Sequence, residues 1–129
     1  MKDLLKQYQA KPLGEKKRYA VFLPLILVND DWHILYEVRS QYVSQPGEVS
    51  FPGGRVESQE TLQEAAVRET VEELTVDASQ IQIWGEIDYL VQSSRTIHCF
   101  VGQLIIDDWK SIQPNEEVDR IFTCLLYTS

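Results

Sequence analysis

The chain has 129 residues, of which 43% are hydrophobic and 25% are charged, and its formal net charge is −8. These values fit one globular domain with its own hydrophobic core. The acidic balance argues against non-specific binding to nucleic acid, but a small anionic substrate stays open because a bound metal can invert the local field. No signal-peptide core and no apolar run long enough to span a membrane occur. We therefore expect a cytoplasmic protein that binds neither nucleic acid nor membranes.

The first third of the chain predicts a short helix followed by a β-hairpin. Residues 3–9 form the helix, which ends before a proline and a glycine. Residues 19–28 are almost continuously apolar, as is typical of a buried strand, and Pro24 within them predicts a bulge or an edge position. The alternating pattern of residues 33–39 predicts the returning strand.

The middle of the chain predicts a loop and then a helix. Residues 40–54 contain two prolines and three glycines, so we expect a loop with special backbone conformations. Thr61 and Glu64 have the spacing of a capping box, and the helix therefore begins at Thr61 and ends near Leu74. Three further strands are predicted, over residues 81–91, 96–106 and 119–126. This element order predicts an α+β fold in which a helix packs on a mixed sheet.

The predicted helix carries three glutamates on one side, at positions 69, 72 and 73, whereas Val67, Thr70, Val71 and Leu74 lie on another side. Each pair of like charges at such spacings costs an isolated helix about 0.2–0.5 kcal/mol. A solvated acidic surface is one interpretation. A bound Mg²⁺ is the other, because hard divalent cations prefer carboxylate oxygens. The second interpretation gains from Arg68, which is the helix's single cation, and from Gly53, whose carbonyl oxygen is a further candidate ligand.

Residues 54–76 resemble the Nudix box, G-x5-E-x7-R-E-U-x-E-E-x-G-U, in which U is a bulky apolar residue. The box positions are occupied by Gly54, Glu60, Arg68, Glu69, Thr70, Glu72, Glu73 and Val76. One position departs, because Thr75 stands where the box has glycine. We expect this threonine to weaken the end of the helix without affecting the metal ligands.

The resemblance implies a Nudix fold, a mixed β-sheet sandwiched between helices (α/β/α), in a single domain over residues 1–129. It also implies hydrolysis of a nucleoside diphosphate linked to another moiety, with Mg²⁺ or Mn²⁺ as the cofactor. The implied metal ligands are Glu69, Glu72, Glu73 and the Gly53 carbonyl. The implied catalytic residues are Glu69, Glu72, Arg68 and Glu60, in which Arg68 orients Glu69 and Glu60 supports the arrangement. Glu116 or Glu117, on a later loop, is a candidate for a further ligand or base.

Residues 38–54 are similar to the signature of Nudix coenzyme A pyrophosphatases, R-S-x3-R-x3-G-x3-F-P-G-G. The second arginine is missing, and the interval from Ser40 to Gly47 is one residue short. This resemblance implies cleavage of coenzyme A or a derivative to 3',5'-ADP and 4'-phosphopantetheine or its acyl form. Arg39, Ser40 and Gly54 would bind the substrate. Two alternatives stay open, a hydrolase of another nucleoside diphosphate such as ADP-ribose, and a non-catalytic Nudix-type nucleotide-binding module.

The subfamily continues with tens of further residues, including a helix, where this sequence ends in "CLLYTS". We therefore expect a domain truncated at its C-terminus, without its last helix, whose natural sequence ends near Thr123. One face of the sheet would then be partly uncovered. The resemblance leaves a homodimer open as the assembly.

Overall fold

A computed structural model describes residues 17–91 and 94–127, and the helix expected at residues 3–9 lies outside them. The described elements are, in chain order, β1 (Lys17–Val28), β2 (Asp31–Arg39), β3 (Val49–Ser50), β4 (Gly53–Arg55), α2 (Leu62–Leu74), η1 (Ala78–Gln80), β5 (Ile81–Val91), β6 (Arg95–Leu104), η2 (Trp109–Ser111) and β7 (Val118–Leu125). The helix and the five long strands that the sequence predicts are all confirmed. The expected loop over residues 40–54 is interrupted by β3, which pairs with β2, and by β4, which pairs with β1.

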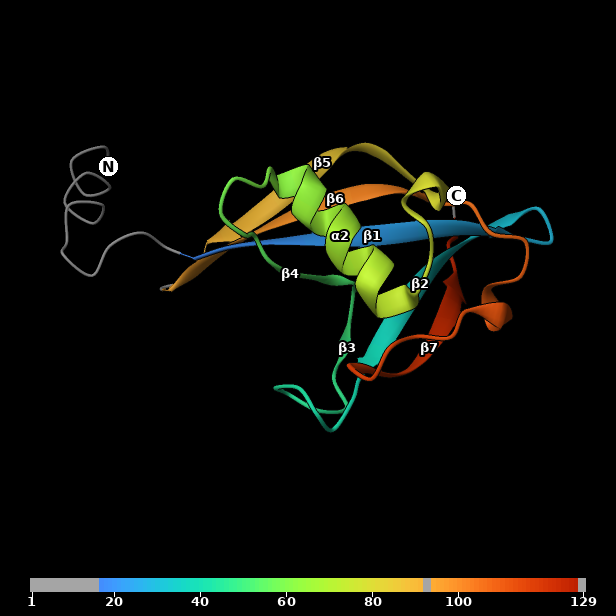
Figure 1. Cartoon of the computed structure of the whole chain (residues 1–129). Coiled ribbons are helices and arrows are strands. Elements are labelled where there is room, and N and C mark those ends of the chain that lie inside the picture. The colour runs from blue at the N-terminus through green and yellow to red at the C-terminus, as the bar shows by residue number, and fades with distance from the viewer. Residues whose placement is uncertain (1–16, 92–93, 128–129) are drawn as a thin grey trace, which may run out of the picture.

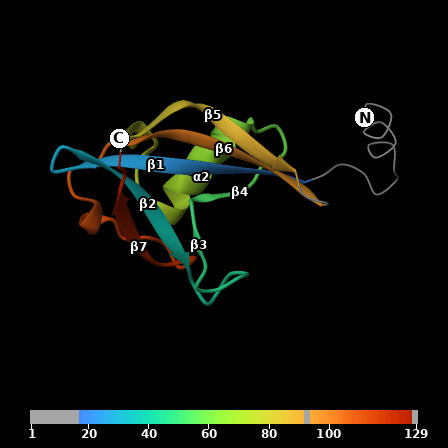
Figure 2. The ribbon, with the colours of Figure 1, turned by 180° about the vertical axis from the view of Figure 1, so that it is seen from behind.

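The strands form one mixed seven-stranded sheet with the order β3-β2-β1-β6-β5, in which β4 also pairs with β1 and β7 with β2. β1 and β6 run parallel, and the other pairs are antiparallel. Helix α2 lies across one face of the sheet, in front of β1 and β6 in Figure 1, and the other face is turned to the viewer in Figure 2. Of the two helical layers that the resemblance implies, the described residues supply this one. No described helix is both long and apolar enough to cross a membrane.

β1 is a central strand, so the edge position predicted from Pro24 is wrong. One edge of β1 pairs with β6, and the other edge pairs with β4 over residues 19–21 and with β2 over residues 25–28. Between these two ranges the Phe22 amide donates to the Pro52 carbonyl at 2.8 Å. Backbone amides two residues apart on a strand face the same edge, so the amide position of Pro24 faces the same edge as that of Phe22. At this position the edge of β1 lies between its pairings with β4 and β2, so proline's missing N–H breaks no hydrogen bond of the sheet.

Helix α2 begins with the predicted capping box. The Thr61 hydroxyl accepts from the Glu64 amide at 3.1 Å, and the Glu64 carboxylate accepts from the Thr61 amide at 2.8 Å. At the other end, Thr75 is the C-cap and adopts left-handed backbone angles, φ 57° and ψ 51°. The box glycine that it replaces suits this conformation because glycine carries no Cβ.

The buried side of α2 differs from the predicted one. Its buried residues are Ala65, Ala66, Thr70, Glu73 and Leu74, whereas Val67 and Val71 are half-buried. The two alanines let the helix approach the sheet closely, and they pack into one core cluster with Ala20, Phe22 and Phe100. This contact turns Glu73 toward the sheet. The expectation that all three glutamates share a side separate from the packed side is therefore wrong.

Candidate active site and metal centre

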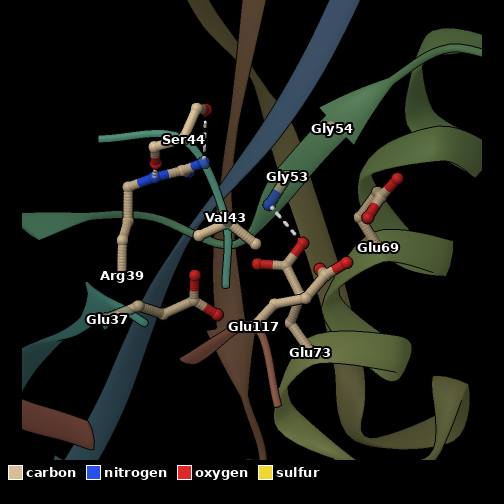
Figure 3. Close-up of a pocket in the computed structure, with 9 residues that line it drawn as sticks. All are labelled: Glu37, Arg39, Val43, Ser44, Gly53, Gly54, Glu69, Glu73 and Glu117. Atoms are coloured by element: carbon tan, nitrogen blue, oxygen red, sulfur yellow. Dashed lines mark hydrogen bonds between the residues drawn. The ribbon is translucent and has the colours of Figure 1, made fainter. Parts of the chain in front are cut away.

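A pocket of about 350 Å³ opens between α2, the ends of β2 and β4, and the loop before β7 (Figure 3). It is lined by Glu37, Arg39, Val43, Ser44, Gly53, Gly54, Glu69, Glu73 and Glu117. Four of these nine residues are glutamates, so the pocket is strongly acidic where it meets the helix.

Three glutamates converge in this pocket. Glu69 and Glu73 come from α2 and Glu117 from the loop before β7, and each offers a carboxylate oxygen within 4.8 Å of the others. The Gly53 amide donates to the Glu73 carboxylate at 3.3 Å, which ties the helix to β4. The sequence assigned Glu117 only as a further candidate, whereas the geometry makes it a full member of the cluster.

The backbone around Asn115 fixes the position of Glu117. The Asn115 amide donates to the Glu73 carbonyl at 2.9 Å, and the Asn115 side-chain oxygen accepts from the Glu117 amide at 2.9 Å. The Glu117 carbonyl in turn accepts from the Ser40 amide at 3.0 Å. Glu117 is thus held between the last turn of α2 and the end of β2.

The two glycines of β4 permit close approach on both of their sides. A Cβ on Gly54 would overlap the carboxylate of Glu69, and a Cβ on Gly53 would overlap Val21 and the Ala20 carbonyl. Gly54 therefore leaves the space that the Glu69 carboxylate occupies, and Gly53 lets β4 lie against β1.

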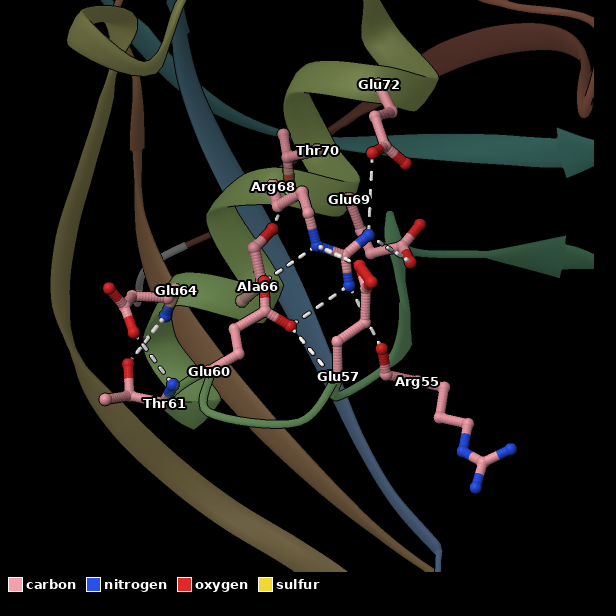
Figure 4. A network of polar contacts seen from close by, with 10 residues as sticks. All are labelled: Arg55, Glu57, Glu60, Thr61, Glu64, Ala66, Arg68, Glu69, Thr70 and Glu72. Atoms are coloured by element: carbon pink, nitrogen blue, oxygen red, sulfur yellow. Dashed lines mark hydrogen bonds and ion pairs between the residues drawn. The ribbon is translucent and has the colours of Figure 1, made fainter.

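Arg68 organises the N-terminal half of the site (Figure 4). Its Nε and Nη2 donate to the two carboxylate oxygens of Glu60 at 2.7 and 3.1 Å, and Nη1 donates to Glu69 at 3.1 Å. Nη2 also donates to the Arg55 carbonyl at 3.1 Å. The hydrogen bonds from Arg68 lower the pKa of Glu60 below its usual value, so Glu60 stays ionised and holds the guanidinium in place.

Glu72 lies apart from the other predicted ligands. Its side chain is 53% exposed and its carboxylate is 3.5 Å from Arg68 Nη1. It does not line the pocket, which instead receives Glu117. The structure thus brings together two of the three box glutamates that the sequence predicts as ligands.

Glu37 is a pocket residue that the sequence analysis did not single out. It lies on β2, is only 2% exposed, and its Oε2 has no hydrogen-bond partner among the described residues. The alternating pattern of β2 was the available signal, since it places Glu37 on the inward side together with Leu35. Burial raises the pKa of Glu37 to about 7, and burial together with the nearby Glu37 raises the pKa of Glu73.

The predicted substrate-binding residues of the loop have different surroundings. The Arg39 guanidinium lines the pocket and donates through Nε to the Ser44 carbonyl at 2.6 Å and through Nη2 to the Ser44 hydroxyl at 3.2 Å. Ser40 is buried, and its hydroxyl accepts from the Tyr42 amide at 3.2 Å. Arg39 is therefore a pocket residue, whereas Ser40 shapes the loop.

The donor set fits a hard divalent cation. Carboxylate oxygens converge from a helix and a loop, and no described lysine or arginine other than Arg39 lines the pocket. Burial raises the pKa of Glu69, even though Arg68 opposes the shift, and burial together with Glu37 raises the pKa of Glu73. Mg²⁺ and Mn²⁺ take such oxygens while keeping some of their waters.

Comparison with known proteins identifies the class of protein that this fold and site define. The model of the NUDIX domain matches residues 16–124, which is most of the chain. The chain therefore belongs to the Nudix hydrolase family.

Two curated relatives give the range of similarity. Nudix hydrolase 3 of Caenorhabditis elegans is 35% identical over 111 residues, covering 81% of this chain and 45% of that protein. The mitochondrial coenzyme A diphosphatase NUDT8 of Mus musculus is 33% identical over 129 residues, covering 94% of this chain and 60% of that protein. The chain thus spans about half the length of the relatives that it matches.

Solved structures agree on the fold. The binary complex of a C. elegans Ap4A hydrolase has a TM-score of 0.70 at 21% identity, covering 82% of this chain and 78% of that one. RenU, a Nudix hydrolase from M. smegmatis, has a TM-score of 0.72 at 19% identity, covering 88% and 76%. The Nudix fold predicted from the sequence is confirmed.

Proposed function

We propose that the chain is a metal-dependent pyrophosphohydrolase that cleaves the diphosphate of coenzyme A or its derivatives. The products would be 3',5'-ADP and 4'-phosphopantetheine or its acyl form. The observation that carries the proposal is the convergence of Glu69, Glu73 and Glu117 in a pocket that Arg39 also lines. The substrate class is supported by the similarity to relatives named as coenzyme A diphosphatases.

Mg²⁺ or Mn²⁺ would be held by Glu69, Glu73 and Glu117, and Glu72 and the Gly53 carbonyl remain predicted further ligands. When bound, such an ion neutralises the diphosphate and lowers the pKa of a coordinated water. Glu72 reaches Arg68 rather than the pocket, so its proposed catalytic part is to help fix the guanidinium.

The side chains around the cluster would orient the reaction. Arg68 and Glu60 hold the Glu69 carboxylate in one orientation, from which it can accept the proton of the attacking water. Arg39 would bind a phosphate oxygen of the substrate through its planar guanidinium. Because Gly54 has no Cβ, the Glu69 carboxylate can lie against β4 at the edge of the pocket in which the diphosphate would bind.

The missing second arginine of the coenzyme A signature favours one alternative. That arginine would supply an anion contact, and its absence weakens the preference for coenzyme A over another nucleoside diphosphate such as ADP-ribose. A non-catalytic nucleotide-binding module is the other alternative. This alternative accounts less well for the contacts by which Glu60 and Arg68 orient Glu69, because a module that only binds a nucleotide does not need an oriented carboxylate.

The remaining sequence predictions concern location and assembly. We propose a small-molecule substrate rather than nucleic acid, in keeping with the net charge of −8. A cytoplasmic location and a homodimer remain predictions.

The test is to incubate the chain with coenzyme A, ADP-ribose and diadenosine polyphosphates, with and without Mg²⁺ or Mn²⁺, and to separate the products chromatographically. Metal-dependent release of 3',5'-ADP from coenzyme A is the expected result. Cleavage of another substrate alone would keep the chemistry and reject the substrate. Metal-independent nucleotide binding without turnover would establish the binding module.

A further inference from the structure

The inference concerns Glu37, which faces Glu73 across the floor of the pocket. Glu37 comes from the middle of β2 and Glu73 from the last turns of α2, and they are 2% and 6% exposed. In Figure 3 the Glu37 carboxylate points toward those of Glu73 and Glu117. Two buried carboxylates from opposite layers of the fold are thus directed at the same space.

The Glu37 carboxylate has no counter-charge in direct contact. Its Oε2 has no hydrogen-bond partner among the described residues. Arg39, two residues along β2, donates hydrogen bonds to Ser44 instead. A buried carboxylate is stable only when it is paired, bound to a metal or neutralised by a proton. In the metal-free protein Glu37 can hold a proton, and a bound cation would take the place of that proton.

The neighbours of Glu37 on the same side of β2 are Leu35, which is fully buried in the core, and Arg39. A leucine or valine at position 37 would extend that core toward the pocket without the cost of burying a charged group. The carboxylate therefore points to a binding role rather than to packing.

We propose that Glu37 is a further oxygen ligand for the divalent cation, supplied from the sheet beside Glu73. The proposal rests on the proposed function, because it assumes that Glu69, Glu73 and Glu117 bind that cation. The ligand set would then come from three separate parts of the chain, namely α2, the loop before β7 and β2. Glu37 lies outside the box motif, so the motif alone cannot assign it.

The test measures Mn²⁺ binding to the purified chain by electron paramagnetic resonance and by titration calorimetry, without substrate. Three variants are compared with the wild type. Glu37→Gln keeps the shape and removes the charge, and Glu37→Asp keeps the charge but withdraws the oxygens by one methylene. Glu48→Gln is the control, because it removes the same charge from an exposed position on the neighbouring loop.

We expect both Glu37 variants to bind Mn²⁺ more weakly by about tenfold or more, and Glu48→Gln to bind like the wild type. Thermal denaturation in EDTA should show that Glu37→Gln is at least as stable as the wild type, and Mn²⁺ should raise its melting temperature less. Binding of Mn²⁺ by Glu37→Gln with wild-type affinity would overturn the proposal. Wild-type affinity in Glu37→Asp would also overturn it, since charge alone would then suffice. If the wild type itself binds no Mn²⁺, both this proposal and the proposed metal site fail.

Discussion

Arg68 and Glu60 form a two-point contact, with Nε 2.7 Å and Nη2 3.1 Å from the two carboxylate oxygens. The third nitrogen, Nη1, is thereby aimed at Glu69, 3.1 Å away. Lysine has no planar fork, so it cannot hold Glu60 and Glu69 in this way. The orientation of Glu69 thus depends on Arg68, which is held in turn by Glu60, eight residues earlier in the chain.

We expect Arg68→Lys to lower kcat by about 10- to 100-fold, the usual cost of removing a group that orients a metal ligand. Arg55→Lys is the matched control, because only the backbone carbonyl of Arg55 takes part in the contact. Steady-state kinetics on the cleaved substrate measure both. Wild-type turnover in Arg68→Lys would remove the orienting role.

Gly54→Ala should impair catalysis because its Cβ would displace the Glu69 carboxylate. We expect activity to fall by about tenfold or more, as for misplaced catalytic groups in general. Gly85→Ala is the control, since a Cβ on Gly85 meets no atom within 4 Å. The comparison requires equal denaturation midpoints for the two variants, and equal activities would contradict the steric argument.

Thr75→Gly should stabilise the protein. Thr75 has a positive φ of 57°, a conformation that costs a β-branched residue about 1–2 kcal/mol and glycine much less. Because glycine also loses more entropy on folding, we expect a net gain of about 1 kcal/mol in the free energy of unfolding. Urea denaturation in EDTA measures it, with Thr75→Ala as the control that keeps the Cβ. A less stable Thr75→Gly would show that the threonine makes a compensating contact.

The metal-free protein should lose stability as the pH rises. The pKa values of Glu37 and Glu73 are raised above the ordinary value of 4.5, so the native state retains protons that the unfolded state releases. Their contribution is fully present below pH 4.5. The part from Glu37 is lost as the pH rises through about 7, and the part from Glu73, whose pKa is raised further, continues to be lost above that pH. The slope is at most about 1.4 kcal/mol per pH unit for each retained proton.

Urea denaturation in EDTA between pH 5 and 8 measures this slope. Glu73→Gln should flatten it and should leave the stability at pH 8 unchanged or slightly higher, while abolishing turnover. An unchanged slope in Glu73→Gln would mean that other groups cause the pH dependence.

The local features of this fold were predictable from the sequence. Thr61 and Glu64 mark the helix start through contacts three residues apart, and the strand patterns depend on alternation within one segment. The box spacing likewise predicted that Arg68 lies beside Glu69 and near Glu60. Each of these features depends on residues close together in the sequence, within one strand or within α2 and the turn that precedes it.

The positions of the remaining site residues depend on tertiary contacts, so the sequence named Glu117 only as one of two candidates and did not single out Glu37. Glu117 joins Glu69 and Glu73 through the hydrogen bond from the Asn115 amide to the end of α2. Glu37 reaches them because β2 lies beside β1, the strand on which α2 packs. Thr70 and Leu74 are buried on the helix as predicted, whereas Ala65, Ala66 and Glu73 are buried where the sequence analysis expected Val67 and Val71.

The interrupted edge of β1 has a consequence for how this enzyme family can diversify. Along this edge of β1, the pairing with β4 ends before Phe22 and the pairing with β2 begins after Pro24. Three backbone hydrogen bonds hold the base of the segment that connects β2 to β4. The Arg39 amide donates to the Glu48 carbonyl, the Gly47 amide to the Arg39 carbonyl, and the Phe22 amide to the Pro52 carbonyl. Beyond these bonds only residues 41–46 project from the sheet, and Val43 and Ser44 there face the pocket. Insertions or deletions at this tip, such as the one-residue shortening after Ser40, can remodel the substrate wall while the carboxylates keep their places. The carboxylate cluster and this wall of the pocket therefore lie on separate parts of the chain, which can change in sequence independently.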